Sequence, residues 1–535
     1  MNATAADSDL VCLAPDTKLE PLVFRWYAWG HLVSPVQLAL SLAFRHLPML
    51  KSFVANPAVH EAARKNPKML GGSFLELGQR DLPAVRALQQ DILTRGADLL
   101  GFAEDLLKLD RQLQKSETGF SLDHHYGALP ASLAGLVEAN YDLNHHPSLR
   151  VLEELIYRGE LAGTAAQEIA FCKTPDAERS FFINTPRLDG EDRFVVPLPF
   201  DSAAYDLVSR SRLSPVPFGV LANALGVDGD AERARLRGYF AQTPPPRKEP
   251  NFAGEGVRVR YFGHACVLVQ SAEVSVLIDP FLAWDDGDDG RLTFHDLPDR
   301  IDYVFLTHNH QDHFSVETLL QLRDRIGTIL VPRNNANSLA DPSMKLALQA
   351  IGQPRVQVLD PMERVAIPGG HLTALPFYGE HADLSIASKH GLHVDLQGRT
   401  LMFLADSDGK DRALYRRIVQ RLGKVDTLFI GMECDGAPLT WLYGPYLSQP
   451  ISRKDDDSRR LSGSGSENAW RIVEEIGCKT AYVYAMGQEP WLRFVAGLQY
   501  TPQSKQIVES DKFIGRCREA GLTAERLYGS RTMRM

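Results

Sequence analysis

The residues best suited to chemistry lie in one short run. Residues 307–313 are Thr-His-Asn-His-Gln-Asp-His, so His308, His310, Asp312 and His313 fall within six positions. Imidazole nitrogens and carboxylate oxygens are common metal ligands in proteins. A His-x-His pair on an extended turn points two imidazoles the same way, and the Asp-His pair that follows can serve a second ion. The run therefore predicts a metal site, which a chance His-rich polar loop explains less well.

Regular elements on both sides must hold this run in place. The apolar residues 304–306 predict a buried strand before it, and residues 316–325 predict a helix after it, with Ser315 suited to cap that helix. A second apolar stretch, residues 400–405, follows a predicted hairpin turn at Gln397-Gly398 and leads to Asp406. Strands that alternate with helices in this half of the chain predict an α/β fold of stacked sheets with helices outside.

The composition is that of a globular protein with more than one domain. The chain has 535 residues, is 44% hydrophobic and 23% charged, and has a formal net charge of −9. At about 150 residues per domain, this length predicts at least two domains. Such an acidic chain is a poor candidate for nucleic-acid binding, which needs a basic face. The six cysteines form no Cys-x-x-Cys pair, which predicts a reducing, cytoplasmic compartment.

No segment of the sequence predicts contact with a membrane. The first nine residues contain neither a basic nor an apolar stretch, so we predict no signal peptide. The most apolar long window, residues 32–50, includes Arg45 and His46 and is typical of an amphipathic helix, because a spanning helix needs about 20 nearly uninterrupted apolar residues.

A proline-rich stretch divides the chain. Four prolines occur in residues 244–250, which neither a helix nor an internal strand accommodates. We predict an N-terminal domain over residues 1–242 for accessory or dimerisation roles, a linker over 243–252 and a catalytic domain over 253–535. The N-terminal part has mainly helical spacing and strand-like pieces at 180–183 and 194–198, which predicts a mixed α+β domain.

The His-x-His-x-Asp-His run resembles that of the metallo-β-lactamase superfamily. Residues 261–265, Tyr-Phe-Gly-His-Ala, and 277–280, Leu-Ile-Asp-Pro, are similar to the opening strands of its lactonase-like branch. The resemblance covers about residues 257–488 and implies a metallo-β-lactamase-like αββα sandwich with two metal ions at one edge. Members of this superfamily usually supply three further ligands, which are a His, a bridging Asp and a last His.

The sequence departs from that pattern at two of these ligands. Asp406 lies where the bridging carboxylate is expected, but the middle ligand is either Glu380 or His381. The last His is missing, because no histidine follows His393. The ligand set implied by the resemblance is His308, His310 and Glu380 for one ion, Asp312 and His313 for the other, and Asp406 shared between them.

This ligand set favours iron over zinc. A hydrolase of this fold relies on strongly Lewis-acidic Zn²⁺ to form hydroxide near neutral pH. An added carboxylate and a missing imidazole make the site more anionic, which works against hydrolysis and stabilises higher oxidation states. Glu380 and Asp406 are therefore the predicted catalytic residues. Unlike an imidazole, the Glu380 carboxylate can change the number of oxygens with which it binds a metal ion.

A site of three histidines and three carboxylates behind a large N-terminal domain resembles the diiron β-hydroxylases, a family that includes the β-hydroxylase of chloramphenicol biosynthesis. The resemblance implies an oxo-bridged pair of iron ions, with O₂ as co-substrate. It implies a monooxygenase that uses two electrons to β-hydroxylate an amino acid, expected to be aromatic. This amino acid would be a thioester on the phosphopantetheine arm of a nonribosomal peptide synthetase carrier domain. An electron-donor reductase and a second copy of the chain, in a homodimer, are the other expected partners.

Other residues near these motifs have two open interpretations. His264 is either a metal-site residue or a hydrogen-bonded core histidine, and Asp279 either orients a ligand histidine or forms a turn. Glu433 contacts either substrate or solvent. The polar, Gly/Ser-rich residues 454–466 predict an exposed loop. Three aromatic residues could line a substrate tunnel, namely Trp441, Tyr443 and Tyr446. Two arginines, Arg459 and Arg460, could contact the carrier domain.

Two other functions compete with the oxygenase. A dinuclear zinc hydrolase of the lactonase-like branch would cleave a lactone, a phosphodiester or a thioester. A noncatalytic assembly protein would hold a structural metal, but structural sites are typically closed cages of four ligands, unlike the open run at 308–313. The bound metal separates the first two, because iron supports the oxygenase and zinc the hydrolase.

Overall fold

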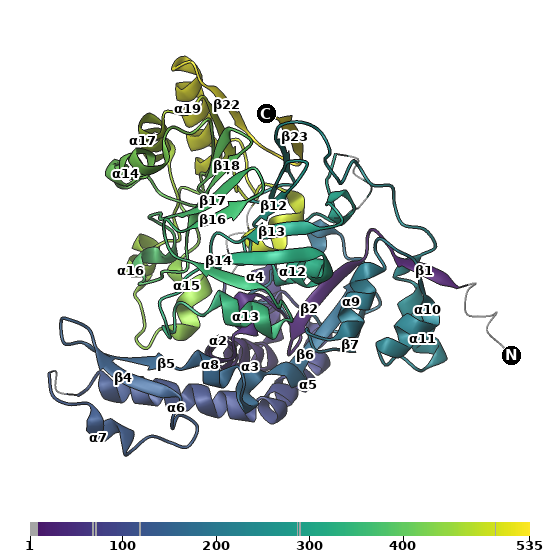
Figure 1. The fold of residues 1–535 in the computed structure, drawn as a ribbon. Helices are drawn as coiled ribbons and strands as arrows, with labels where there is room; N and C mark the ends of the chain where they lie inside the picture. Colours follow the sequence, from purple (N-terminus) through teal and green to yellow (C-terminus); the bar gives the residue numbers. More distant parts are fainter. Residues whose placement is uncertain are drawn as a thin grey trace.

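The chain folds into two parts that pack against each other. The computed structural model describes residues 9–66, 69, 72–116, 119–285, 287, 290–497 and 499–535; residues 1–8, where we predicted no signal peptide, lie outside them. An N-terminal part of helices and small sheets lies beside a C-terminal part of two large sheets (Figure 1). Among the described helices, none combines the length and apolarity needed to cross a membrane.

Two seven-stranded sheets form the C-terminal part. Their strand orders are β15-β14-β13-β12-β11-β10-β23 and β16-β17-β18-β19-β20-β21-β22. The first sheet consists of β10 Arg258–Tyr261, β11 Val267–Gln270, β12 Ser275–Ile278, β13 Ile301–Phe305, β14 Ile326–Pro332, β15 Val356–Leu359 and β23 Arg531–Arg534. The second consists of β16 Arg364–Ile367, β17 Gly370–Leu375, β18 Gly391–Leu396, β19 Arg399–Phe403, β20 Thr427–Gly431, β21 Thr480–Tyr484 and β22 Thr523–Arg526.

Helices cover the outer faces of both sheets. The inner faces share one core, which includes Val267, Phe305 and Phe403. A second core lies between the second sheet and three helices, and a third joins the first sheet to two helices and to the N-terminal part. These helices are α14 Arg412–Leu422, α17 Ser466–Ile476 and α19 Lys505–Glu519, and α12 Val316–Leu322 and α13 Met344–Ala350. The predicted αββα sandwich is confirmed.

The strand directions bring several strand ends to one edge. Strands β12 to β15 run parallel, as do β19 to β22. The segments that follow parallel strands leave the sheet at the same edge. The hairpin of β18 and β19 turns at Gln397 and Gly398, whose φ angles of 52° and 74° suit the predicted two-residue turn. This edge carries the candidate site.

Small sheets and many helices form the N-terminal part. Its sheets are β3-β2-β6-β7, β8-β1-β9 and the hairpin β4-β5. Their bounds are β1 Leu10–Leu13, β2 Lys18–Val23, β3 Trp26–Tyr27, β4 Val137–Tyr141, β5 Pro147–Val151, β6 Gln167–Cys172, β7 Arg193–Pro197, β8 Val216–Pro217 and β9 Phe240–Ala241. The helices are α1 Gly30–Val33, α2 Pro35–Ser41, α3 Leu47–Ala55, α4 Pro57–Arg64, α5 Leu82–Arg95, α6 Ala97–Leu113, α7 Asp123–Tyr126, α8 Glu153–Ile156, α9 Ala203–Arg210, α10 Phe218–Ala224 and α11 Asp230–Arg237.

Two local predictions were wrong. Residues 180–183 form no strand, because the N–H of Phe182 donates to the carbonyl of Phe494 in α18 (Arg493–Ala496) instead of to a sheet. Residues 454–466 are not simply an exposed loop. They include most of α16 (Arg453–Ser458), and Leu461 and Ser464 beyond it are buried. Residues 242–257 contain neither helix nor strand, and the division into domains at this stretch stays a prediction.

Candidate metal centre

The predicted metal-binding run lies directly after β13. Ser315, two residues after the run, caps α12 by accepting a hydrogen bond from the N–H of Thr318, as predicted. His308 and His313 are fully buried, with no exposed surface. The run is thus held between a core strand and a helix, which fixes the directions of its histidines.

The six residues predicted as ligands come together at this edge. His310 Nδ1 lies 2.6 Å from Glu380 Oε1, and Asp406 Oδ2 lies 3.1 Å from His313 Nε2 and 3.6 Å from His308 Nε2. Donor atoms that lie within 4.8 Å of one another form four groups, which are His308, His310 and Glu380; His308, His313 and Asp406; His264, Asp312 and His313; and Glu380, Asp406 and Glu433. Because the groups share members, the donors form one continuous site with room for two ions.

Several donor atoms of the site have no hydrogen-bond partner among the described residues. They are His308 Nε2, His313 Nε2, Glu380 Oε2 and Asp406 Oδ1, all of them buried. Buried polar atoms are normally paired, because leaving one unpaired costs about 1–3 kcal/mol. Converging nitrogen and oxygen atoms without partners are what divalent cations bind, so these residues fit a metal pair.

Hydrogen bonds to Asp279, direct or through Thr307, fix the orientation of two of the histidines. Its carboxylate accepts hydrogen bonds from the N–H and the hydroxyl of Thr307 at 2.7 and 2.6 Å, and from His313 Nδ1 at 2.8 Å. The Thr307 oxygen in turn lies 3.0 Å from His308 Nδ1 and can accept its proton. With both Nδ1 atoms engaged, His308 and His313 present their Nε2 atoms to the site. Of its two interpretations, Asp279 therefore takes the orienting one.

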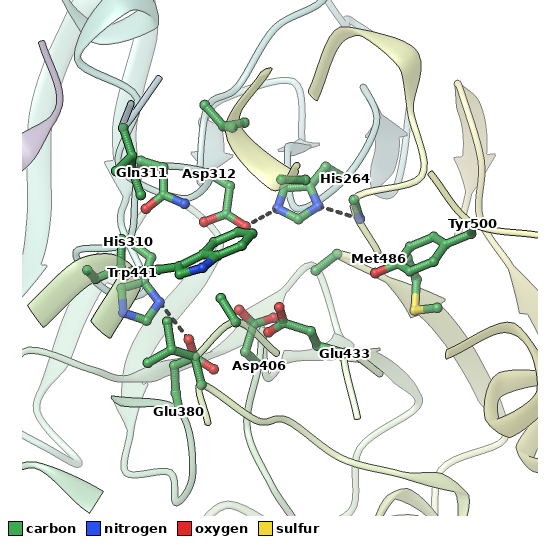
Figure 2. A pocket seen from close by; sticks show the side chains of 18 residues that line it. His264, His310, Gln311, Asp312, Glu380, Asp406, Glu433, Trp441, Met486 and Tyr500 are labelled. Carbon is green, nitrogen blue, oxygen red and sulfur yellow. Dashed lines mark hydrogen bonds and ion pairs between the residues drawn. The ribbon is translucent and has the colours of Figure 1, made fainter. Parts of the chain in front are cut away.

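His264 lies beside the predicted ligand Asp312. Its Nδ1 accepts a hydrogen bond from the N–H of Gly487 at 3.1 Å, so the proton of a neutral ring lies on Nε2. That Nε2 lies 3.2 Å from Asp312 Oδ2, and Figure 2 shows the two side chains facing each other. His264 Nε2 makes no hydrogen bond among the described residues, and with Asp312 and His313 it forms one of the groups that could hold a metal ion.

Glu380, and not His381, faces the other donors. Residues 379–383 all have positive φ, which is rare for side-chain-bearing residues and turns Glu380 toward His310. His381 is buried, and its Nδ1 lies 2.9 Å from the hydroxyl of Tyr443. Among the described residues, no group of three donors includes His381.

The charges of the side chains in the site favour a bound cation. Burial, with His313 nearby, holds the pKa of His308 well below its ordinary value, so its ring is neutral and able to bind a metal. Burial and the charges of Glu380 and Asp406 raise the pKa of Glu433 well above its ordinary value. Carboxylates this close repel one another, and a bound cation would relieve that repulsion.

A small cavity of about 60 Å³ opens onto these donors. His310, Asp312, Glu380, Asp406 and Glu433 line its polar end. In Figure 2 the carboxylates of Asp406 and Glu433 lie side by side, with Trp441 near His310 and Met486 and Tyr500 on the opposite side. The apolar lining is formed mainly by Ile183, Trp441, Leu442, Leu461, Met486 and Val495. Only Ile183 in this set comes from the N-terminal part.

The remaining candidates have other contacts. Tyr446 bonds to His31 at 3.0 Å. The two arginines considered for the carrier hold backbone carbonyls instead: Arg459 binds that of Ala382 and Arg460 that of Gly436.

Two residues of the site have roles that the sequence did not reveal. Thr307 precedes His308 directly, so its position beside a ligand was a usable signal. Tyr443 was predicted only as a tunnel wall, yet its hydroxyl lies 3.1 Å from His310 Nε2 across 133 residues of sequence. No local pattern marks such a contact.

Comparison with known proteins shows one family along nearly the whole chain. Residues 12–244 match the diiron non-heme β-hydroxylase N-terminal domain, and residues 258–435 match a β-lactamase superfamily domain. The chain is 36% identical over 531 residues to the 4-amino-L-phenylalanyl-[CmlP-peptidyl-carrier-protein] 3-hydroxylase of Streptomyces venezuelae, which covers 98% of this chain and 99% of that protein. The crystal structure of CmlA, a diiron β-hydroxylase from the same organism, matches with a TM-score of 0.91 at 36% identity, covering 98% of this chain and 100% of that one.

Hydrolases of the same superfamily match far less of the chain. A UPF0173 metal-dependent hydrolase of Christiangramia forsetii is 23% identical over 153 residues, which is 26% of this chain and 66% of that protein. The similarity to the hydroxylase therefore extends over the N-terminal part as well, which the short hydrolase match cannot span.

Proposed function

The chain belongs to the diiron non-heme β-hydroxylase family, and from this premise we propose that it hydroxylates the β-carbon of an amino acid held as a thioester on a carrier domain. The full-length match at 36% identity to a hydroxylase named for a carrier-bound amino acid carries the proposal. The chain is a diiron oxidoreductase, and the comparisons do not favour the alternative of a zinc hydrolase.

We assign the ligands of the two irons from the geometry. His308, His310 and Glu380 would hold one ion, Asp312 and His313 the other, and Asp406 would bridge them. The unpaired Nε2 atoms of His308 and His313 and the unpaired oxygens of Glu380 and Asp406 support this division. When bound, the iron pair supplies the redox chemistry that activates O₂ with two electrons and inserts one oxygen atom into a C–H bond.

The residues around the cavity orient the substrate. Trp441, Leu442 and Val495 offer an apolar surface that suits an aromatic or large apolar side chain. Glu433 faces the same cavity, and no ion pair or hydrogen bond to its carboxylate is found among the described residues. A carboxylate here suits the α-ammonium group of an aminoacyl thioester, which would place the neighbouring β-carbon toward the metal donors.

Three partners complete the proposal. A nonribosomal peptide synthetase carrier domain delivers the amino acid, and a reductase supplies the electrons. A homodimer is the third, for which the β4-β5 hairpin offers apolar side chains. Leu143, between its strands, is fully exposed, and Phe120 nearby in sequence is 65% exposed. The hairpin lies at the periphery of the molecule in Figure 1. All six cysteines are unpaired, which suits a reducing, cytoplasmic compartment.

Mass spectrometry tests the reaction directly. Aminoacyl carrier domains are incubated with the chemically reduced, iron-loaded protein and air, and the expected product gains one oxygen atom on the aminoacyl group. Free amino acids serve as the control and should stay unchanged. Hydrolysis of the thioester without oxygen insertion, by protein that carries two zinc ions, would contradict the proposal.

A further inference from the structure

One buried tyrosine hydroxyl lies between two imidazole rings at the metal centre. Tyr443 Oη lies 3.1 Å from His310 Nε2 and 2.9 Å from His381 Nδ1. Tyr443 is almost fully buried, and no solvent is needed to satisfy its hydroxyl. The three side chains come from the run after β13, from the loop that carries Glu380 and from α15 (Leu439–Tyr443).

The protons of these three groups have one consistent arrangement. His310 Nδ1 lies 2.6 Å from Glu380 Oε1, so Nδ1 is the atom that faces the donors of the first ion. A neutral imidazole carries one proton, and with Nδ1 used as a ligand atom the proton must lie on Nε2. His310 Nε2 then donates to the Tyr443 oxygen, and the Tyr443 hydroxyl donates to His381 Nδ1. Each contact has one donor and one acceptor.

His310 faces the metal site with its Nδ1 atom, whereas His308 and His313 face it with Nε2. His308 and His313 have Nδ1 engaged with Thr307 and Asp279 and present Nε2 to the site. Among the described residues, no other group bonds to His310 Nε2. Without the Tyr443 oxygen, the ring could rotate or change tautomer and lose the Nδ1 approach to the first ion.

We propose that Tyr443 is a positioning residue that fixes the tautomer of His310, so that His310 binds its metal ion through Nδ1. This inference rests on the ligand division proposed above. Helix α15 also carries Trp441 and Leu442, which line the cavity, and Arg45 of the N-terminal part donates to the carbonyls of Thr440 and Trp441 at 3.0 and 2.6 Å. Tyr443 therefore connects the cavity wall to one of the two ions.

Metal binding by the full-length Tyr443→Phe variant tests this inference. Titration with Co²⁺, a spectroscopic substitute for Fe²⁺, should show that one of the two sites binds about 10- to 100-fold more weakly while the other is unchanged. In the cobalt protein, the exchangeable proton on His310 Nε2 should give a paramagnetically shifted NMR signal. In the variant this proton should exchange with water faster, because its acceptor is gone.

Tyr446→Phe is the matched control. This hydroxyl also bonds to a buried histidine, His31, at 3.0 Å, but not to a predicted ligand. Its removal should leave both cobalt affinities and the shifted imidazole signal unchanged. If Tyr443→Phe binds both ions as the unmodified protein does and its shifted signal is unaltered, the inference is wrong.

A second pair of variants tests the same arrangement should Tyr443→Phe fail to fold. His381→Asn keeps an acceptor for the Tyr443 hydroxyl and should preserve both affinities, whereas His381→Leu removes it and should weaken one site. Equal binding by the two variants would overturn the arrangement. The proposed reaction fails separately: a protein that binds two ions normally but adds no oxygen to any aminoacyl carrier contradicts the function and leaves the role of Tyr443 standing.

Discussion

The two sides of the metal centre are built in different ways. The strand side consists of Asp279, Thr307, His308 and His313. Asp279, Thr307 and His308 lie just beyond the ends of the neighbouring parallel strands β12 and β13, and His313 follows in the same run. One carboxylate, that of Asp279, accepts three of their hydrogen bonds. All four are fully buried. The geometry of this side follows directly from the register of two core strands.

The loop side consists of His310, Glu380, His381 and Tyr443. Its backbone at residues 379–383 has positive φ throughout, a conformation that costs energy for residues with side chains and persists only when the surroundings hold it. Three contacts hold it. Lys389 Nζ donates to the Gly379 carbonyl at 2.8 Å, Arg459 to the Ala382 carbonyl at 3.0 Å, and the Glu380 N–H to the Ser462 carbonyl at 3.1 Å.

The difference indicates separate tasks for the two sides. The strand side is preorganised by the core. The loop side depends on segments far apart in the sequence, including α15 at the cavity wall, so it can respond to what occupies the cavity. Variants on the strand side should therefore cost stability as well as metal, and variants on the loop side should change chemistry more than stability.

Asp279→Ala should have the largest effect. It leaves the His313 Nδ1 proton and the Thr307 N–H and hydroxyl without their buried acceptor. Breaking such a buried charge-assisted pair costs about 3 kcal/mol or more. We expect the free energy of unfolding of the metal-free protein to fall by about this amount, measured by urea denaturation, and both metal ions to be lost on purification.

Asp312→Ala is the matched variant at a partly exposed carboxylate, which is 23% exposed and orders no backbone. It should lose one ion while the free energy of unfolding of the metal-free protein changes little. If Asp312→Ala destabilises the metal-free fold as strongly as Asp279→Ala, the strand side has no special structural role.

Glu380→His should separate metal binding from hydroxylation. The imidazole restores the ligand type of the hydrolase branch, so two metal ions should still bind. The carboxylate that can change its coordination is lost, and the rate of oxygen insertion should fall by at least about 100-fold. Metal analysis and mass spectrometry of the aminoacyl carrier measure the two properties on the same sample. A fully active Glu380→His protein would remove the argument for iron chemistry from the ligand set.

The same contrast explains what the sequence could predict. The strand side and the sandwich follow from local patterns: the apolar strand and the Ser315 cap are confirmed, and the structure brings the side chains of the run at 308–313 to one edge. On the loop side, residues alone left Glu380 and His381 as alternatives. The choice depends on five consecutive positive φ angles and on a tyrosine 62 residues beyond His381. Leu461 and Ser464 are buried by similar long-range contacts. The polar residues next to them in the sequence therefore led to the wrong prediction of an exposed loop.

Glu433→Gln should mainly affect substrate binding. If Glu433 binds the α-ammonium group, losing its charge removes a charge-assisted hydrogen bond, which is equivalent to about a tenfold increase in KM for the aminoacyl carrier. The two ions should remain bound and kcat should change less than KM. Asp435→Asn is the control, because this exposed carboxylate pairs with Lys505 outside the cavity. A loss of metal without a change in KM would instead make Glu433 a ligand.

A further contact links the loop side to the N-terminal part. Glu153 in α8 accepts a hydrogen bond from the N–H of Ser343 at 3.0 Å. Nearby, Asp341 accepts hydrogen bonds from the N–H groups of Ala387 and Ser388, next to Lys389. These bonds link Glu153 to the segment around Lys389, the residue that donates a hydrogen bond to the Gly379 carbonyl in the Glu380 loop. Because of these hydrogen bonds, the ionisation of Glu153 reports on how tightly the N-terminal part packs against the loop side.

Burial raises the pKa of Glu153 from 4.5 to about 8. Between these values the folded protein holds a proton that the unfolded chain releases, so the free energy of unfolding falls as pH rises, by at most about 1.4 kcal/mol per pH unit. Glu153→Gln still accepts the Ser343 hydrogen bond but cannot ionise, so urea denaturation across this range should show a shallower decline. The exposed neighbour Glu154→Gln should keep the original slope. Identical slopes for all three proteins would mean that Glu153 is ionised in the fold and that the two parts of the chain join more loosely there than its burial implies.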